Sequence, residues 1–312
     1  MSTALFFLLG LVLLYIGGEG LVRGAATIGV RLGLTPLIAG LTIVGFATSA
    51  PELAVSMDAA LRGAPGLSVG NVVGSNICNL ALILGIAALL QPASVRDSLS
   101  RVDIAVLLAS TLLVPLLFLD SVLMRLEGSL LVAGMIIYLW MSIRQARRSE
   151  HPDAGQSNLP ALSQSMPINI LVSIASLVLL IVGSEFFVAA SMDIALLLGV
   201  SAAVVGLSAA AIGTSLPELT TSIICARHGH PEMAAGNLIG SNIFNLLLIL
   251  GATGIVTPLT PDGVGLADLG VMIGVTLLAV SLMVFRNRLG RGAGTVLVLI
   301  YIGYIGSLFA TQ

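Results

Sequence analysis

The chain reads GFATSAPE at residues 45–52 and GNVVGSN at 70–76, and both stretches return as AIGTSLPE at 211–218 and GNLIGSN at 236–242. The displacement between the copies is constant at 166 residues, as from Thr48 to Thr214 and from Glu52 to Glu218. Over 45–85 and 211–251, 21 of 41 aligned positions are identical without a gap. A carboxylate, hydroxyls and amides therefore recur inside apolar sequence. This pattern predicts a duplicated membrane protein with one ion site at its centre.

The composition excludes an ordinary soluble domain. The chain is 57% hydrophobic and 9% charged, whereas soluble domains carry roughly 25% charged residues, and its mean hydropathy is +1.10. Apolar runs of about 18–22 residues recur, which is long enough to cross a hydrocarbon core of about 30 Å. We expect the lipid bilayer to be the main partner, with no nucleic acid and no required protein partner.

Two local features bear on processing and redox state. The first apolar run, 4–16, has no basic leader or separating cleavage site, so it is interpreted as a mature helix and not as a signal peptide. Cys78 and Cys225 both fall in apolar helical stretches. They are expected to be buried, reduced packing residues.

Hydropathy and helix breakers predict ten membrane spans and one sizeable connecting loop. The spans are placed at about 3–22, 36–61, 67–91, 102–119, 122–143, 167–190, 202–227, 233–257, 267–285 and 292–310. The loop at 144–166 is polar and contains proline. This divides the chain into a first five-helix repeat at 1–143, a linker at 144–166 and a second repeat at 167–312.

The arginines predict the orientation of these spans, because the chain has no lysine. Arg62 and Arg125 alone fall on one side of the predicted topology, and the other eleven fall on the opposite side. Positive residues favour the cytoplasmic side. We therefore expect a multi-pass protein of the cell membrane with both termini outside and the 144–166 loop in the cytoplasm. The cytoplasmic set is Arg23, Arg31, Arg96, Arg101, Arg144, Arg147, Arg148, Arg227, Arg286, Arg288 and Arg291.

Each repeat holds five spans, which is an odd number, so the second copy must enter the bilayer from the side opposite to the first. The fold class expected is therefore an all-α polytopic membrane protein made of two inverted five-helix repeats. In secondary transporters of this architecture the binding site lies at the interface between the repeats, near the midplane.

Glu52 and Glu218 lie roughly in the middle of the second and seventh spans. An ionised carboxylate at that depth is costly and marks a functional site by default. The structural alternative is a protonated or paired glutamate that only holds helices together. Two such carboxylates in one site of low dielectric repel each other, which favours protonation unless a cation binds.

The residues around each glutamate can share its helical face. Pro51 and Pro217 have no N–H, so each frees a main-chain carbonyl one turn earlier. Hydroxyls three and four residues before each glutamate face the same way, and Ser75 with Asn79 repeats that spacing in the third span. Helix–helix adhesion is the alternative use of such small polar groups. The full set is Thr48, Ser49, Thr214, Ser215, Ser75, Ser241, Asn79 and Asn245, with Asn71, Asn76, Asn237 and Asn242 nearby.

All of these ligand candidates are oxygens, and no histidine or cysteine cluster accompanies them, which disfavours zinc, copper and iron. Six to eight flexible oxygens with two carboxylates suit Ca²⁺ better than Mg²⁺. Two negative charges balance one Ca²⁺ or two Na⁺. Both cations cannot occupy the ligands fully at once, and this mutual exclusion is a physical basis for exchange.

The doubled motifs ATSAPE, GTSLPE, GSNICN and GSNIFN resemble the repeats of the cation/calcium exchanger superfamily, and the similarity spans essentially the whole chain. The chain looks like the compact prokaryotic sodium/calcium exchanger type. The resemblance implies Ca²⁺ binding by Glu52, Glu218 and the main chain at Thr48 and Thr214. It further implies flanking Na⁺ sites, or site lining, formed by Ser49, Ser215, Ser75, Ser241, Asn79, Asn245 and the carbonyls near Gly45 and Ala211.

Two positions depart from the superfamily pattern. Ala47 stands where glycine is usual, and Asn245 stands where some members, including the potassium-dependent branch, have aspartate. The site then holds two acidic groups and not three, which favours a potassium-independent exchanger.

The function expected is a secondary antiporter, not an enzyme, in which Na⁺ influx drives Ca²⁺ out by alternating access, with no cofactor. The nearest alternative is H⁺/Ca²⁺ exchange through the same two glutamates. A cation channel would need a continuous pore, and an intramembrane enzyme would need a base that these spans do not offer.

Overall fold

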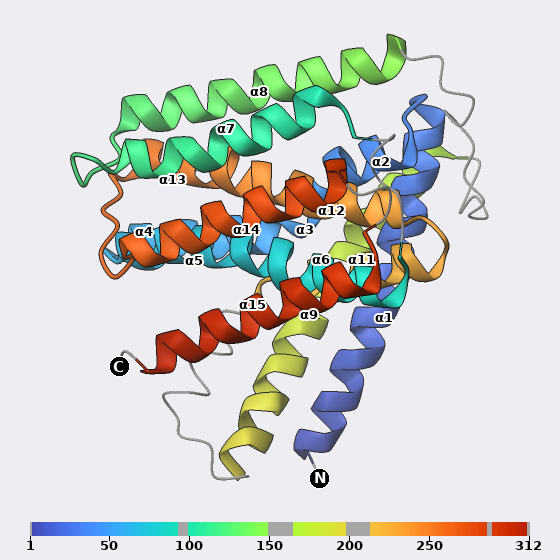
Figure 1. Cartoon of the computed structure of the whole chain (residues 1–312). Coiled ribbons are helices and arrows are strands. Elements are labelled where there is room, and N and C mark those ends of the chain that lie inside the picture. The colour runs from blue at the N-terminus through green and yellow to red at the C-terminus, as the bar shows by residue number, and fades with distance from the viewer. Residues whose placement is uncertain (1, 93–98, 149–164, 198–212, 286–288, 311–312) are drawn as a thin grey trace.

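The structure is a computed structural model that describes residues 2–92, 99–148, 165–197, 213–285 and 289–310. Its elements are helices (Figure 1), and three short segments among them are π-helical and are labelled η in the text. The first half holds α1 (Ser2–Arg31), α2 (Pro36–Ala39), η1 (Gly40–Val44), α3 (Gly45–Thr48), α4 (Ala50–Leu61), α5 (Pro65–Ile77), η2 (Cys78–Ile83), α6 (Leu84–Leu90), α7 (Arg101–Leu117) and α8 (Arg125–Arg148). The second holds α9 (Met166–Leu197), α11 (Leu216–Arg227), α12 (Pro231–Ile243), η3 (Phe244–Ile249), α13 (Leu250–Val256), α14 (Leu266–Phe285) and α15 (Arg291–Ala310).

Every predicted span contains a helix, so the all-α membrane fold is confirmed. Within the described ranges, eight helical rods are long and apolar enough to cross a membrane. The other two spans correspond to α7, which has 17 residues, and to α11, whose preceding residues 198–212 lie outside the described part of the chain.

The described connections between helices lie at the two ends of the bundle, as expected for helices that each cross a membrane. At one end the α7–α8 and α13–α14 loops join through paired hydrogen bonds between Leu123 and Leu259, with N···O distances of 2.8 and 3.0 Å. At the other end Gln91 after α6, Pro231 at the start of α12 and Leu289 before α15 line a common crevice.

The two repeats are inverted relative to each other, and the α1–α9 pair demonstrates this most directly. Along α1, Gly10 approaches Phe187 of α9, Gly17 approaches Leu180 and Gly24 approaches Ser173. Each step of seven residues forward in α1 is a step of seven backward in α9, so the two helices are antiparallel. In Figure 1 they lie side by side and slant across the other long helices.

One contact in this pair occurs twice, once from each repeat. A Cβ on Gly17 would lie 2.9 Å from the Leu180 nitrogen, and a Cβ on Gly183 would lie 2.8 Å from the Leu14 nitrogen. Gly183 and Leu180 are the residues 166 positions after Gly17 and Leu14. The contact is therefore self-complementary, as an approximate two-fold axis between inverted repeats demands.

The sequence prediction placed the ends of these two helices too early. The first span was predicted at 3–22 and the sixth at 167–190, but α1 ends at Arg31 and α9 at Leu197. Polar residues continue α1 because Glu19 pairs with Arg23 one turn later, and Thr27 donates a hydrogen bond to the Arg23 carbonyl at 2.7 Å. At 1.5 Å per residue, α1 is about 45 Å long, which exceeds a hydrocarbon core of about 30 Å.

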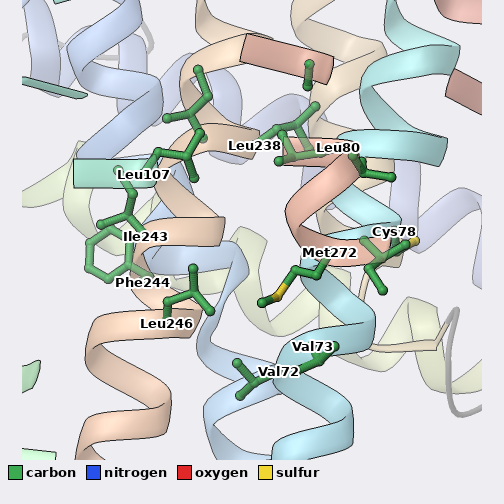
Figure 2. Close-up of a cluster of buried hydrophobic side chains, with 14 of the residues drawn as sticks. Val72, Val73, Cys78, Leu80, Leu107, Leu238, Ile243, Phe244, Leu246 and Met272 are labelled. Carbon is green, nitrogen blue, oxygen red and sulfur yellow. The ribbon is translucent and has the colours of Figure 1, made fainter. Parts of the chain in front are cut away.

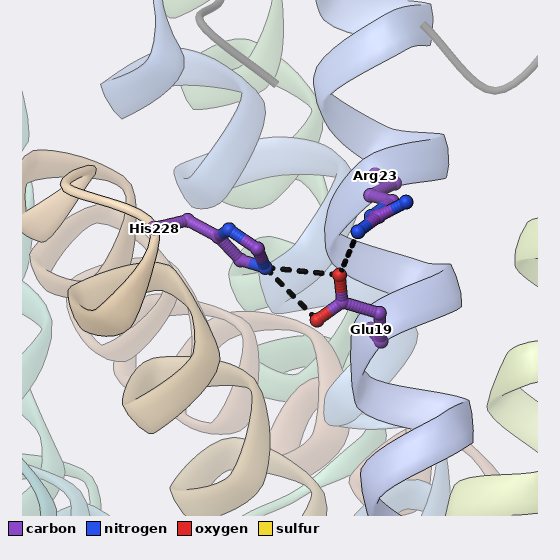
Figure 3. Close-up of polar contacts among 3 residues, drawn as sticks. All are labelled: Glu19, Arg23 and His228. Carbon is purple, nitrogen blue, oxygen red and sulfur yellow. Dashed lines mark hydrogen bonds and ion pairs between the residues drawn. The ribbon is translucent and has the colours of Figure 1, made fainter. Parts of the chain in front are cut away.

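A half-buried contact ties α1 to the turn after α11. His228 Nε2 lies 2.9 Å from both carboxylate oxygens of Glu19, which also binds Arg23 (Figure 3). A histidine in a short turn is usually solvated, so the sequence does not predict this contact. Glu185, which lies 166 residues after Glu19, is exposed, and Ala189 stands where the first repeat has Arg23.

The apolar core lies around the rods that carry the GNxxGSN motifs. In the rods 65–90 and 231–256, 78% of the most apolar window is buried, against 28% in α8 and α9. Figure 2 shows Leu80, Leu238 and Met272 packed within this core. Cys78 and Cys225 are both buried and free, as expected. The repeated motifs are therefore held at the centre of the molecule.

Each repeat also closes its outer helix pair with an aspartate–tyrosine hydrogen bond. Tyr138 of α8 donates to Asp103 of α7 at 3.0 Å, and Tyr304 of α15 donates to Asp268 of α14 at 2.9 Å. Both aspartates also accept a main-chain N–H that precedes their helix. The first pair is buried and the second is only partly buried.

We predict that Tyr138→Phe lowers the free energy of unfolding by about 1–3 kcal/mol, because it leaves a buried carboxylate oxygen without its donor. Tyr304→Phe, the matched control, should cost less since its pair is closer to solvent. Thermal unfolding of both variants in detergent measures this difference. An equal or larger loss for Tyr304→Phe would contradict the argument from burial.

Candidate functional site

Each glutamate of the repeated motif lies in the first turn of a broken helix. α3 ends at Thr48, Ser49 has ψ 0°, and α4 then begins at Ala50 with Glu52 in its first turn. The second repeat copies this, with Ser215 at ψ 4° before α11 and Glu218 in the first turn. The prolines account for the position of the break, because a proline is tolerated in the first turn of a helix but not in its interior.

The breaks place the carboxylates favourably for negative charge. A helix N-terminus carries a partial positive charge that stabilises a nearby anion. Both glutamate side chains are nevertheless fully buried, with 0% exposure. If both were ionised, the site would hold two like charges away from water.

Ser241 brings the two motifs into direct contact. Its Oγ lies 3.4 Å from the Gly45 carbonyl oxygen, 3.3 Å from the Thr48 hydroxyl and 3.5 Å from Glu218 Oε1. Gly45 permits this approach, since a Cβ there would lie 3.1 Å from the Ser241 nitrogen. Residues predicted from both repeats therefore meet in one place.

The asparagines of the GSNxxN motifs cross the interface between the repeats. Asn79 and Asn245 sit in the matching π turns η2 and η3, a feature that often marks functional sites. Asn79 Nδ2 donates to Asn242 Oδ1 at 3.0 Å, and Asn245 Nδ2 donates to Asn76 Oδ1 at 3.2 Å. The amide oxygens of Asn79 and Asn245 are buried and accept no hydrogen bond within the described residues.

Unpartnered oxygens are concentrated at this site. Buried polar atoms normally have hydrogen-bond partners, yet eight buried oxygens of the predicted site residues have none among the residues that the structure describes. They are Ser49 Oγ, both carboxylate oxygens of Glu52, Thr214 Oγ1, Ser215 Oγ, Glu218 Oε2, Asn79 Oδ1 and Asn245 Oδ1. Oxygens of these types fit a hard cation such as Ca²⁺ or Na⁺.

For the remaining predicted site residues the structure gives a position but few contacts, and one of them is not described. Ser75 is buried in α5 one turn before Asn79. Thr214, the counterpart of Thr48, lies near the Glu52 carboxylate, but neither group makes a hydrogen bond within the described residues. Ala211 lies outside the described residues.

Three further hydroxyls, which were not predicted from the sequence, accept hydrogen bonds from the motif asparagines Asn237 and Asn71. Asn237 accepts from the Thr48 hydroxyl at 3.1 Å and donates to Thr221 and Ser222. Asn71 donates to Ser56 at 2.9 Å and to the main-chain oxygen of Glu52 at 3.3 Å. Two of these hydroxyls could have been found from the sequence, because Ser56 and Ser222 are identical at matching positions of the two repeats.

Comparisons with known proteins agree with this architecture. The family described as "Sodium/calcium exchanger protein" matches residues 2–144 and 168–310. The chain is 37% identical to CaxA of Alkalimonas amylolytica over 99% of both proteins. It is 33% identical to the sodium/calcium exchanger MaX1 of Methanosarcina acetivorans over 98% of both.

A solved structure extends the match to three dimensions. The structure of the sodium-calcium exchanger NCX_Mj, soaked with Na⁺ and without Ca²⁺, superposes with a TM-score of 0.84 at 32% identity. The match covers 98% of this chain and 99% of that one. With two inverted repeats, a buried oxygen-rich centre and matches over nearly the full length, this chain belongs to the sodium/calcium exchanger family of membrane antiporters.

Proposed function

We propose that the protein exchanges Na⁺ for Ca²⁺ across the cell membrane by alternating access, independently of K⁺, with Na⁺ influx driving Ca²⁺ out. The observation that carries this proposal is the set of eight unpartnered buried oxygens around Glu52 and Glu218. Two carboxylates neutralise either one Ca²⁺ or two Na⁺, so one ion species must leave before the other is fully bound. The names of MaX1 and NCX_Mj as sodium/calcium exchangers support the same ions.

We assign the ligand roles to the residues gathered at the two helix breaks. Glu52, Glu218 and the main chain at Thr48 and Thr214 would hold Ca²⁺. Flanking Na⁺ ions would use the hydroxyls and carbonyls beside them, with the neutral amides lining the centre. These flanking groups are Ser49, Ser215, Ser75, Ser241, Gly45, Ala211, Asn79 and Asn245. Since Asn245 adds no third carboxylate, K⁺ is not required for charge balance.

Alternating access would come from the α1–α9 pair moving across the central helices that carry the motifs, which are α4, α5, α11 and α12. The pair is joined through backbone approaches at glycines and slants across the other helices (Figure 1). The orientation proposed from the arginines places both termini outside and the 144–166 linker, between repeats at 1–143 and 167–312, in the cytoplasm.

Flux of radiolabelled Ca²⁺ into proteoliposomes with imposed gradients tests the proposed ions. An outward Na⁺ gradient should drive Ca²⁺ uptake without K⁺, and an imposed pH gradient should not replace it. H⁺/Ca²⁺ exchange through the same glutamates is the competing outcome. Uptake that follows the pH gradient and ignores Na⁺ would overturn the sodium proposal in favour of the proton one.

We predict that Glu52→Gln and Glu218→Gln each reduce Na⁺-driven Ca²⁺ flux by about 100-fold or more, since a bound Ca²⁺ would keep one uncompensated buried charge, which costs roughly 3–5 kcal/mol. Glu185→Gln is the control, because Glu185 is an exposed carboxylate outside the assigned site residues. It should retain normal flux. Normal flux in either motif variant, at equal amounts of folded protein, would refute the site assignment.

A further inference from the structure

The four asparagines of the GSNxxN motifs form a hydrogen-bond chain with a defined direction. Asn242 Nδ2 donates to the main-chain carbonyl of Asn76 at 3.1 Å. A main-chain carbonyl can only accept, so this bond fixes which end of the Asn242 amide is the NH₂ group. Asn242 Oδ1 must then face the other way, where it accepts from Asn79 Nδ2.

The orientation of Asn242 in turn determines the orientation of the Asn79 amide, which is a candidate cation ligand. Because Asn79 uses its Nδ2 to satisfy Asn242, its Oδ1 is the end left toward the site, and that oxygen is buried without a partner. In the other repeat Asn76 Oδ1 accepts from Asn245 Nδ2 and leaves Asn245 Oδ1 unpartnered, but Asn76 Nδ2 has no partner among the described residues, so this bond alone sets the direction there. Each candidate ligand is thus held by an asparagine of the opposite repeat.

The direction of an amide matters for a cation. Its carbonyl oxygen is a Ca²⁺ ligand, whereas its NH₂ group carries partial positive charge and only donates hydrogen bonds. The two ends are nearly equal in size, so packing alone does not select between them. A hydrogen-bond partner must make that selection.

We infer that Asn242 and Asn76 are positioning residues that orient the amides of Asn79 and Asn245, so that oxygen and not NH₂ faces the transported cation. This inference rests on the proposed function. It differs from simple adhesion between α5 and α12, which would need the hydrogen bonds but no particular direction.

A double-mutant cycle on Ca²⁺ affinity distinguishes orientation from adhesion. Asn242→Leu should raise the Kd for Ca²⁺ about tenfold, the equivalent of one lost hydrogen bond, because the Asn79 amide is free to turn its NH₂ group inward. In an Asn79→Asp background the same change should alter the Kd by less than about twofold, since a carboxylate presents oxygen in either orientation.

The mirror cycle, Asn76→Leu with Asn245→Asp, repeats the test with the other repeat and serves if Asn242→Leu does not fold. Binding of radiolabelled Ca²⁺ to purified full-length protein is the measurement, with folding checked by size-exclusion chromatography. Thr253→Val is the control, because its buried hydroxyl bonds only within its own helix, to the Ile249 carbonyl. It should leave the Kd unchanged.

The outcomes separate the two proposals. A tenfold loss that disappears in the aspartate background supports orientation. An equal loss in both backgrounds, or no loss in either, would overturn the inference while leaving the proposed function intact. Failure of the unaltered protein to bind Ca²⁺ would overturn the proposed function and this inference together.

Discussion

The structure depends on the burial of two like-charged carboxylates inside a membrane protein. Glu52 and Glu218 are both fully buried, and they repel each other when both are ionised. Transfer of one such ion out of water costs several kcal/mol even after relaxation, and mutual repulsion adds to that. A bound cation offsets both terms at once. The requirement for a neutralising partner therefore turns a destabilising feature into a selective binding site.

The surrounding fold serves to make oxygens available at that point. Regular helices consume their main-chain groups and leave none for an ion, so the chain interrupts its helices where the motifs meet. The helix geometry changes at Ser49 and Ser215 and the following prolines have no N–H, while the π turns at Cys78–Ile83 and Phe244–Ile249 widen the helix at Asn79 and Asn245. Inversion of the repeats brings these interruptions together from opposite directions, as the Gly17–Leu180 and Gly183–Leu14 contacts illustrate.

The sequence was sufficient for the architecture because its signals were local and doubled. The offset between Thr48 and Thr214, the spacing of Thr48 and Glu52, and the count of five apolar runs per copy together predict the inverted fold and the gathering of the motifs. Arg23 misled the prediction of where the first span ends. A charged residue usually marks the end of a span, but here Glu19 neutralises it within the helix.

The finer geometry was not predictable because it is set by contacts between the repeats. Nothing in GSNICN or GSNIFN indicates that Asn76 and Asn242 each hold an asparagine of the other repeat, or that the helices widen to π turns there. Such features arise from packing of rods that are distant in sequence. The pairing of His228 with Glu19, 209 residues away, is of the same kind (Figure 3).

The most direct test of the central claim is the stoichiometry of equilibrium Ca²⁺ binding to the purified protein, measured at increasing Na⁺ concentrations. Two inverted repeats that build one shared site predict one Ca²⁺ per chain, displaced by Na⁺ until none remains. Two Ca²⁺ per chain, or Ca²⁺ that stays bound at saturating Na⁺, would contradict a single shared site.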